Sequence, residues 1–102
     1  MATTVLLSAG DCWPLVLAGR LAAREDVTAV LLDRAADLAR PSHPSHGRVT
    51  AAIDAGATVL VDTAALRRRG LPTTAIADGI SPTDLAAVGD LLVDATDKTI
   101  WL

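Results

Sequence analysis

Residues 3–32 read TTVLLSAGDCWPLVLAGRLAAREDVTAVLL, and this stretch decides the fold class. Its two ends, 3–8 and 27–32, are β-branched and apolar, a pattern typical of strands that are covered on both faces. Between them, residues 14–24 carry apolar side chains at helical spacing, and Pro14 suits the first turn of a helix. A strand, a helix and a second buried strand in this order indicate a parallel β-α-β unit.

The same alternation of strands and helices continues to the end of the chain. After residue 32 we expect a helical turn (33–39), a Pro- and Ser-rich loop (40–47), a helix stopped by Gly56 (49–55) and a strand (57–61). A helix capped by Thr63 (63–69) comes next, followed by a short helix or loop that leads to a short strand (73–80). The last segments are a helix capped by Ser81, with Asp84 as its capping-box acid and with Leu85, Val88, Leu91 and Leu92 as its buried stripe, and a closing strand (98–101). This order predicts a single three-layer α/β/α domain over residues 1–102, with a mostly parallel sheet of about four or five strands.

The composition restricts the functional classes. The net charge is −3 and the only run of basic residues is 67–69, so broad electrostatic binding of nucleic acid is not expected. Cys12 is the only cysteine, so an intrachain disulfide is excluded and an oxidising compartment is not implied. The first seven residues do not resemble a signal peptide, and no apolar stretch approaches the length of a membrane span. We therefore expect a cytoplasmic protein.

The core has to be built from small aliphatic side chains. Apolar residues make up 51% of the chain, whereas aromatic residues make up 2% and consist of Trp13 and Trp101 alone. Small side chains allow helices to pack closely on a sheet, but each buries little apolar area. The sequence therefore predicts that the chain gains further burial by forming a homo-oligomer.

A candidate site is expected at the carboxyl edge of the sheet, where open parallel sheets bind their ligands. The four segments expected at that edge are 8–13, 33–47, 62–63 and 78–81. They contain the chemically versatile side chains of the chain, namely Ser8, Asp11, Cys12, Asp33, His43, His46 and Asp62. The alternative interpretation is that polar residues collect in loops because loop backbone is solvated.

Cys12 is the candidate nucleophile. It lies at the turn into the first helix, where backbone amides favour the thiolate form. The alternative is a small buried side chain tucked under that helix beside Trp13, since free cysteines are among the most buried residues.

His43 and His46 are candidate binding residues, but the sequence does not predict a metal site. They are separated by Pro44 and Ser45 in a segment expected to be a mobile loop, and Zn²⁺ would need a third ligand such as Cys12 or Asp62. No cofactor is expected either, because residues 8–11 carry one glycine and neither of the usual phosphate-loop patterns.

The second half of the chain resembles the DsrE/DsrF/DsrH superfamily of small sulfur-relay proteins, which includes the TusB, TusC and TusD subunits. The resemblance is carried by a strand at 58–61, a helix ending in Arg69-Gly70-Leu71, the run Asp78-Gly79-Ile80 leading to Pro82-x-Asp84-Leu85, and a last strand finishing Asp97-Lys98-x-x-Ile100-Trp101. The closing tryptophan and the Arg-Gly-Leu step look most like the DsrH/TusB branch.

This resemblance implies a DsrE-like fold, assembly with itself or with sister DsrE-type subunits, and transfer of persulfide sulfur between cysteines. In the DsrE/TusD branch the sulfur-carrying cysteine lies just after the third strand, where this chain has Asp62-Thr63-Ala64-Ala65. That role therefore cannot be carried over, and Cys12 could replace the missing thiol only from a different loop. Three hypotheses remain open: a persulfide carrier that uses Cys12, a non-catalytic assembly subunit, and a small-ligand-binding α/β domain.

Overall fold

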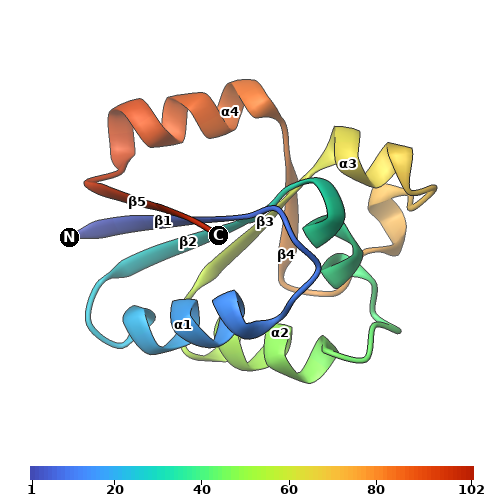
Figure 1. Cartoon of the computed structure of the whole chain (residues 1–102), viewed down its shortest axis with the longest axis horizontal. Helices are drawn as coiled ribbons and strands as arrows, with labels where there is room; N and C mark the ends of the chain where they lie inside the picture. The colour runs from blue at the N-terminus through green and yellow to red at the C-terminus, as the bar shows by residue number, and fades with distance from the viewer.

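The computed structural model describes residues 1–102 and contains one five-stranded sheet in the order β4-β3-β2-β1-β5 (Figure 1). The strands are β1 (Ala2–Leu7), β2 (Asp26–Leu31), β3 (Thr58–Asp62), β4 (Ile80–Thr83) and β5 (Lys98–Trp101). Every neighbouring pair is parallel, with β1 between β2 and β5 and with β3 between β2 and β4. The predicted α/β class with a parallel sheet is confirmed.

The helical segments lie between the strands in sequence. They are α1 (Trp13–Ala22), the 3₁₀ helix η1 (Asp33–Ala39), α2 (His46–Asp54), α3 (Thr63–Arg68), the 3₁₀ turn η2 (Thr73–Ala75), α4 (Leu85–Asp90) and the π-helical turn η3 (Leu91–Ala95). Gly56 and Gly70 follow α2 and α3 with φ of 107° and 66°, the left-handed conformation that ends a helix and favours glycine.

The main core lies on one face of the sheet. Successive side chains of a strand point to opposite faces, so Val5, Ala29 and Val59 share this face and are fully or almost fully buried. Leu15 of α1 and Val49 of α2 cover them and belong to the same cluster. Further burial comes from η1 and from the first turns of α3, so this face is closed by four helical segments.

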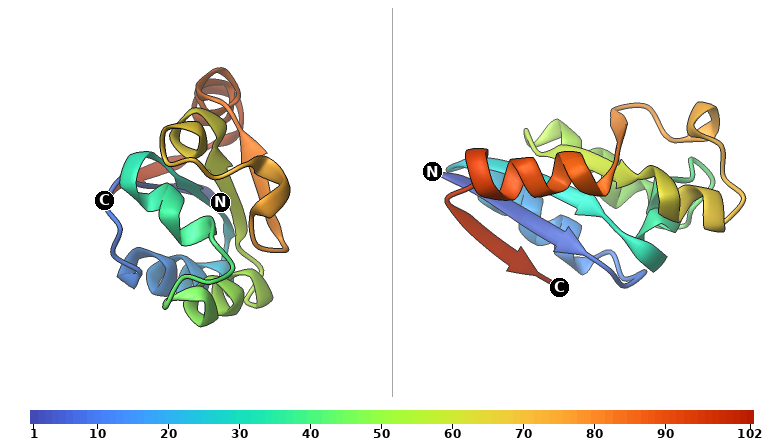
Figure 2. Two further views of the ribbon diagram at one scale, coloured as in Figure 1. Left: turned by 90° about the vertical axis from the view of Figure 1, so that its right-hand side faces the viewer. Right: turned by 90° about the horizontal axis from the view of Figure 1, so that it is seen from above.

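The opposite face has a thinner cover. Leu6 and Val30 point to this side and pack with Val88 of α4 in a cluster of three buried residues, flanked by half-buried leucines of η3. Figure 2 shows α4 on the side of the sheet opposite to α1 and α2. The layers are therefore unequal, although both faces carry helices as predicted.

Several details of the predicted elements are wrong. Ser81 and Pro82 do not start a helix but lie in β4, because β4 is an edge strand and an edge strand tolerates the missing N–H of proline. The cap of α4 is Asp84, whose Oδ1 accepts a hydrogen bond of 2.8 Å from the Ala87 N–H, and Leu85 is 64% exposed rather than buried.

The cap of α3 was also misplaced by one residue. Asp62, and not Thr63, accepts the hydrogen bond from the first turn of α3. Aspartate at the end of a strand can turn its carboxylate back over the next residues, which makes it as good a cap as threonine.

None of the helices is long enough and apolar enough to cross a membrane.

Candidate functional site

The carboxyl ends of three adjacent strands bring several predicted site residues to one edge. In the register of the sheet Leu7 lies beside Leu31, and Leu31 lies beside Val61. Ser8 directly follows β1, Asp33 comes shortly after β2, and Asp62 is the last residue of β3. All three residues therefore lie at this edge of the sheet. The fourth expected segment, 78–81, does not: β4 begins at Ile80, which places Asp78 at the amino edge.

Cys12 lies in the loop that leads from β1 into α1, at the N-cap position of that helix. The residue is half-buried, its thiol is free, and it packs against the main core. Its side chain accepts no capping hydrogen bond, while its carbonyl oxygen accepts one of 3.0 Å from the Leu15 N–H. The next residue, Trp13, is 55% exposed. Cys12 as a residue is therefore only partly buried, and its thiol is not used to cap the helix.

The other polar residues at this edge, Ser8, Asp11 and Asp62, differ in their burial and in their hydrogen bonds. The Ser8 hydroxyl donates to the Leu102 carbonyl oxygen at 3.2 Å, which ties the end of β1 to the end of the chain. Asp11 is exposed. Asp62 is only 4% exposed; its Oδ2 accepts from the Ala65 N–H at 3.3 Å, while its Oδ1 is buried without a hydrogen-bond partner.

The two histidines belong to the segment that leads into α2. The His43 Nδ1 accepts a hydrogen bond of 3.0 Å from the Ser45 N–H. His46 does not lie in a loop as predicted but begins α2, and its Nδ1 is buried without a partner. His46 and Asp78 both line a hollow of about 340 Å³, and Cys12 does not line this hollow. No group of three or more His, Cys, Asp and Glu residues is placed to hold a metal ion.

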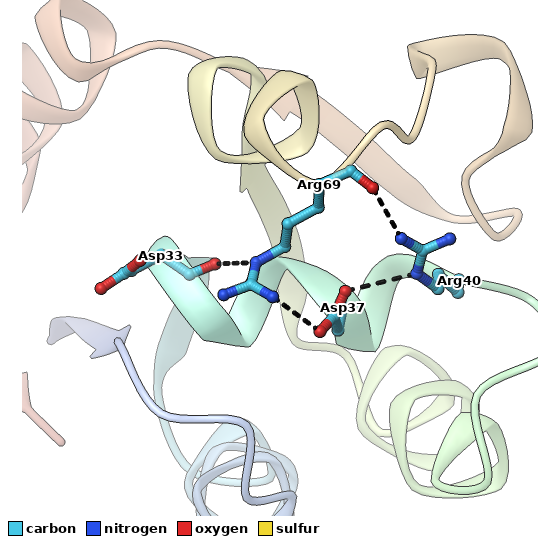
Figure 3. A network of polar contacts seen from close by, with 4 residues as sticks. All are labelled: Asp33, Asp37, Arg40 and Arg69. Atoms are coloured by element: carbon cyan, nitrogen blue, oxygen red, sulfur yellow. Dashed lines mark hydrogen bonds and ion pairs between the residues drawn. The ribbon is translucent and has the colours of Figure 1, made fainter.

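A polar network that the sequence did not predict holds η1, the segment after β2 (Figure 3). Arg69, at the end of α3, donates from Nε to the Asp33 carbonyl oxygen at 3.1 Å and from Nη1 to Asp37 Oδ2 at 2.9 Å. Arg40 contacts the other Asp37 oxygen at 3.3 Å and donates to the Arg69 carbonyl oxygen at 3.0 Å. Asp33 has a φ of 48°, an uncommon value for a residue other than glycine. The network therefore fixes a bent backbone at the carboxyl edge.

A groove between α1 and α2 was also missed. Two adjoining hollows of about 300 and 380 Å³ share Val16, Arg20 and Arg48, and the second is also lined by Trp13. Besides the two arginines, the first hollow is lined by apolar and small residues, namely Leu15, Val16, Gly19, Ala51, Ala52 and Ala55. The signal in the sequence was the occurrence of small residues on both helices, and Gly19 of α1 lies so close to Ala52 of α2 that an added Cβ atom would be 3.4 Å from the Ala52 Cα.

Comparison with known proteins shows the fold alone. No protein-family model and no curated protein matches the sequence. Among solved structures, the ychN protein from E. coli matches with a TM-score of 0.83 and 17% identity over 100% of both chains. MTH1491 from Methanobacterium thermoautotrophicum, a protein of unknown function, matches with a TM-score of 0.78 and 14% identity over 99% of this chain and 98% of its own. These likenesses support a DsrE-like fold.

Proposed function

We propose that this chain is a sulfur-relay-type protein in which Cys12 accepts persulfide sulfur. The observation that carries the proposal is the position of Cys12: a half-buried residue with a free thiol at the start of a helix, at the carboxyl edge of a DsrE-like sheet. Cys12 is the only sulfur nucleophile in the chain.

The proposed step is thiol–persulfide exchange. The Cys12 thiolate attacks the terminal sulfur of a donor persulfide, a bond forms between Cys12 Sγ and that sulfur, and the donor S–S bond breaks. The donor cysteine leaves as a thiolate, so the step needs no external oxidant or reductant. Transfer to an acceptor thiolate repeats the exchange in the opposite sense.

This site differs from the one that the family resemblance implies. Asp62 and Thr63 occupy the end of β3 and the start of α3, where the DsrE/TusD branch has its cysteine. Cys12 follows β1, which is separated from β3 by β2. The same sheet edge would therefore serve sulfur transfer from a different loop.

The test is loading of the folded protein with sulfur. After incubation with a cysteine desulfurase, cysteine and pyridoxal phosphate, intact-mass analysis of the wild-type chain is expected to show the addition of one sulfur atom, reversed by a reducing agent. Cys12→Ser should gain none. The alkylation rate of Cys12, followed over pH on the folded chain, reports its access. A thiol that reacts only after unfolding overturns the relay proposal.

A second candidate function is a non-catalytic assembly subunit, and the exposure of both tryptophans favours it. Trp13 and Trp101 are 55% and 69% exposed, and Val93 is 83% exposed. Large apolar side chains on the surface of a chain this small are typical of interfaces. If Cys12 stays unmodified while the chain forms a defined oligomer, the assembly role is the better conclusion.

A further inference from the structure

The α1–α2 groove carries positive charge that the chain itself does not neutralise. Arg20 and Arg48 border both of its hollows. The only ion pairs in the structure join Asp37 to Arg40 and to Arg69, so neither groove arginine is paired. A groove lined by small apolar residues and bordered by two unpaired guanidinium groups fits a helix with small and acidic residues on one side.

The outer face of α4 and η3 carries small and acidic residues of this kind. Val88 faces the sheet, whereas Ala86, Gly89, Asp90 and Val93 are exposed and recur at helical spacing. A side chain added at Gly89 would meet nothing within 4 Å. This face of small residues and an aspartate therefore has room for a close neighbour.

The charge of this segment is opposite to that of the groove. No lysine or arginine occurs between Arg69 and Lys98, whereas five aspartates do. Asp90 and Asp94 are exposed and form no ion pair in the chain. They are four residues apart, so they lie on neighbouring turns and can reach two cations on one partner surface.

We propose that the occupant of the groove is a second copy of this chain, whose α4–η3 segment docks between α1 and α2. Asp90 and Asp94 of one copy would pair with Arg20 and Arg48 of the next. Because the groove and α4 lie on opposite faces of the sheet, the contact is head-to-tail: each copy offers a groove to one neighbour and a helix to another. Such contacts close into a ring or extend as a filament.

This inference rests on the assembly role and not on sulfur chemistry, although the two meet at one place. Trp13 lines the groove and directly follows Cys12. A docked α4 would cover Trp13 and leave the loop at 8–12 at the margin of the interface. The acceptor thiol would then lie next to the contact between two copies.

Charge reversal on each side tests the contact. Arg20→Glu/Arg48→Glu and Asp90→Arg/Asp94→Arg change exposed side chains, so the fold is expected to survive, which circular dichroism checks. In sedimentation velocity over a concentration series, each double variant should weaken self-association by at least about tenfold. The fourfold variant, which swaps both sets of charges, should restore it.

Arg67→Glu/Arg68→Glu is the matched control, because it makes the same change in net charge on α3, away from the groove. It should associate as the wild type does. If the wild type oligomerises and the groove variants do so equally well, or if the fourfold variant fails to recover, the proposed contact is wrong while the assembly role stands. A wild-type chain that stays monomeric at high micromolar concentration overturns both.

Discussion

At the residue scale, Asp62 combines two opposite contributions to stability. It is buried at the end of β3, where one carboxylate oxygen caps α3 and the other has no partner. A capping oxygen stabilises a helix because it satisfies an N–H group that has no acceptor within the helix. A buried oxygen without a donor costs free energy because it has lost its hydrogen bonds to water.

Substitution of Asp62 separates these contributions. Asp62→Ser keeps a capping oxygen and removes the unpartnered one, whereas Asp62→Ala removes both. We expect the serine variant to be more stable than the alanine variant by about 1 kcal/mol, the usual value of a helix cap. Urea denaturation of the two variants measures this difference. If the alanine variant is at least as stable, the Asp62 carboxylate does not act as a cap.

The histidines give a second prediction at this scale. The His43 Nδ1 already accepts a backbone hydrogen bond, and His46 is the first residue of α2, so the two rings do not form a ready pair of ligands. Dialysis against a chelator should therefore leave the melting temperature unchanged. A fall of several degrees, restored by Zn²⁺, would show that a structural metal had been removed.

At the element scale, Arg69 connects the end of α3 to η1. Its guanidinium group contacts the Asp33 carbonyl oxygen and the Asp37 carboxylate from two different nitrogens. The planar fork of arginine makes both contacts at once, which the single ammonium group of lysine cannot do. This cross-connection holds the two segments that flank the carboxyl end of β2 and β3.

Removal of this connection should be measurable. Arg69→Ala is expected to lower the free energy of unfolding by about 1 kcal/mol through the loss of its hydrogen bonds, and Arg69→Lys should recover only part of it. The neighbouring Arg68 is exposed and makes no such contact, so Arg68→Ala should change stability by less than about 0.5 kcal/mol. Equal losses in the two alanine variants would mean that the network adds nothing.

At the scale of the whole molecule, the two faces differ in charge as well as in cover. The only charged residues between positions 70 and 97 are aspartates, and Asp90 and Asp94 are exposed on the α4 side, whereas the α1–α2 groove carries two unpaired arginines. A contact held by exposed ion pairs weakens with salt, because the screening length falls from about 10 Å at 0.1 M to about 3 Å at 1 M. An interface held by apolar burial alone would not weaken in this way.

This difference predicts how Trp13 behaves. In a Trp101→Phe variant, Trp13 is the only fluorophore, and its emission should shift to shorter wavelength as the protein concentration rises. Added NaCl should reverse the shift over the same range that reduces the sedimentation coefficient. Emission of Trp13 that is independent of concentration, in a chain that does oligomerise, would place the interface elsewhere.

Local signals were sufficient for most of the elements. The apolar runs of β1, β2 and β3, the helical spacing of α1, and Gly56 and Gly70 after α2 and α3 are all properties of short segments, so the sequence alone predicted them. The parallel sheet followed because strands that alternate with helices need crossover connections. The placement of Ser8, Cys12 and Asp62 at one edge followed from that topology.

The sequence could not predict the features that depend on which elements become neighbours. Ser81 and Pro82 carry the pattern of a helix start, yet they pair with Leu60 and Val61 because β3 offers an open edge. The Arg69–Asp37 contact, the groove between α1 and α2 and the opposite charges of the two faces join residues that are distant in the chain. Propensity and periodicity describe neighbours along the chain, whereas these contacts exist only after the sheet order has set the distances between elements.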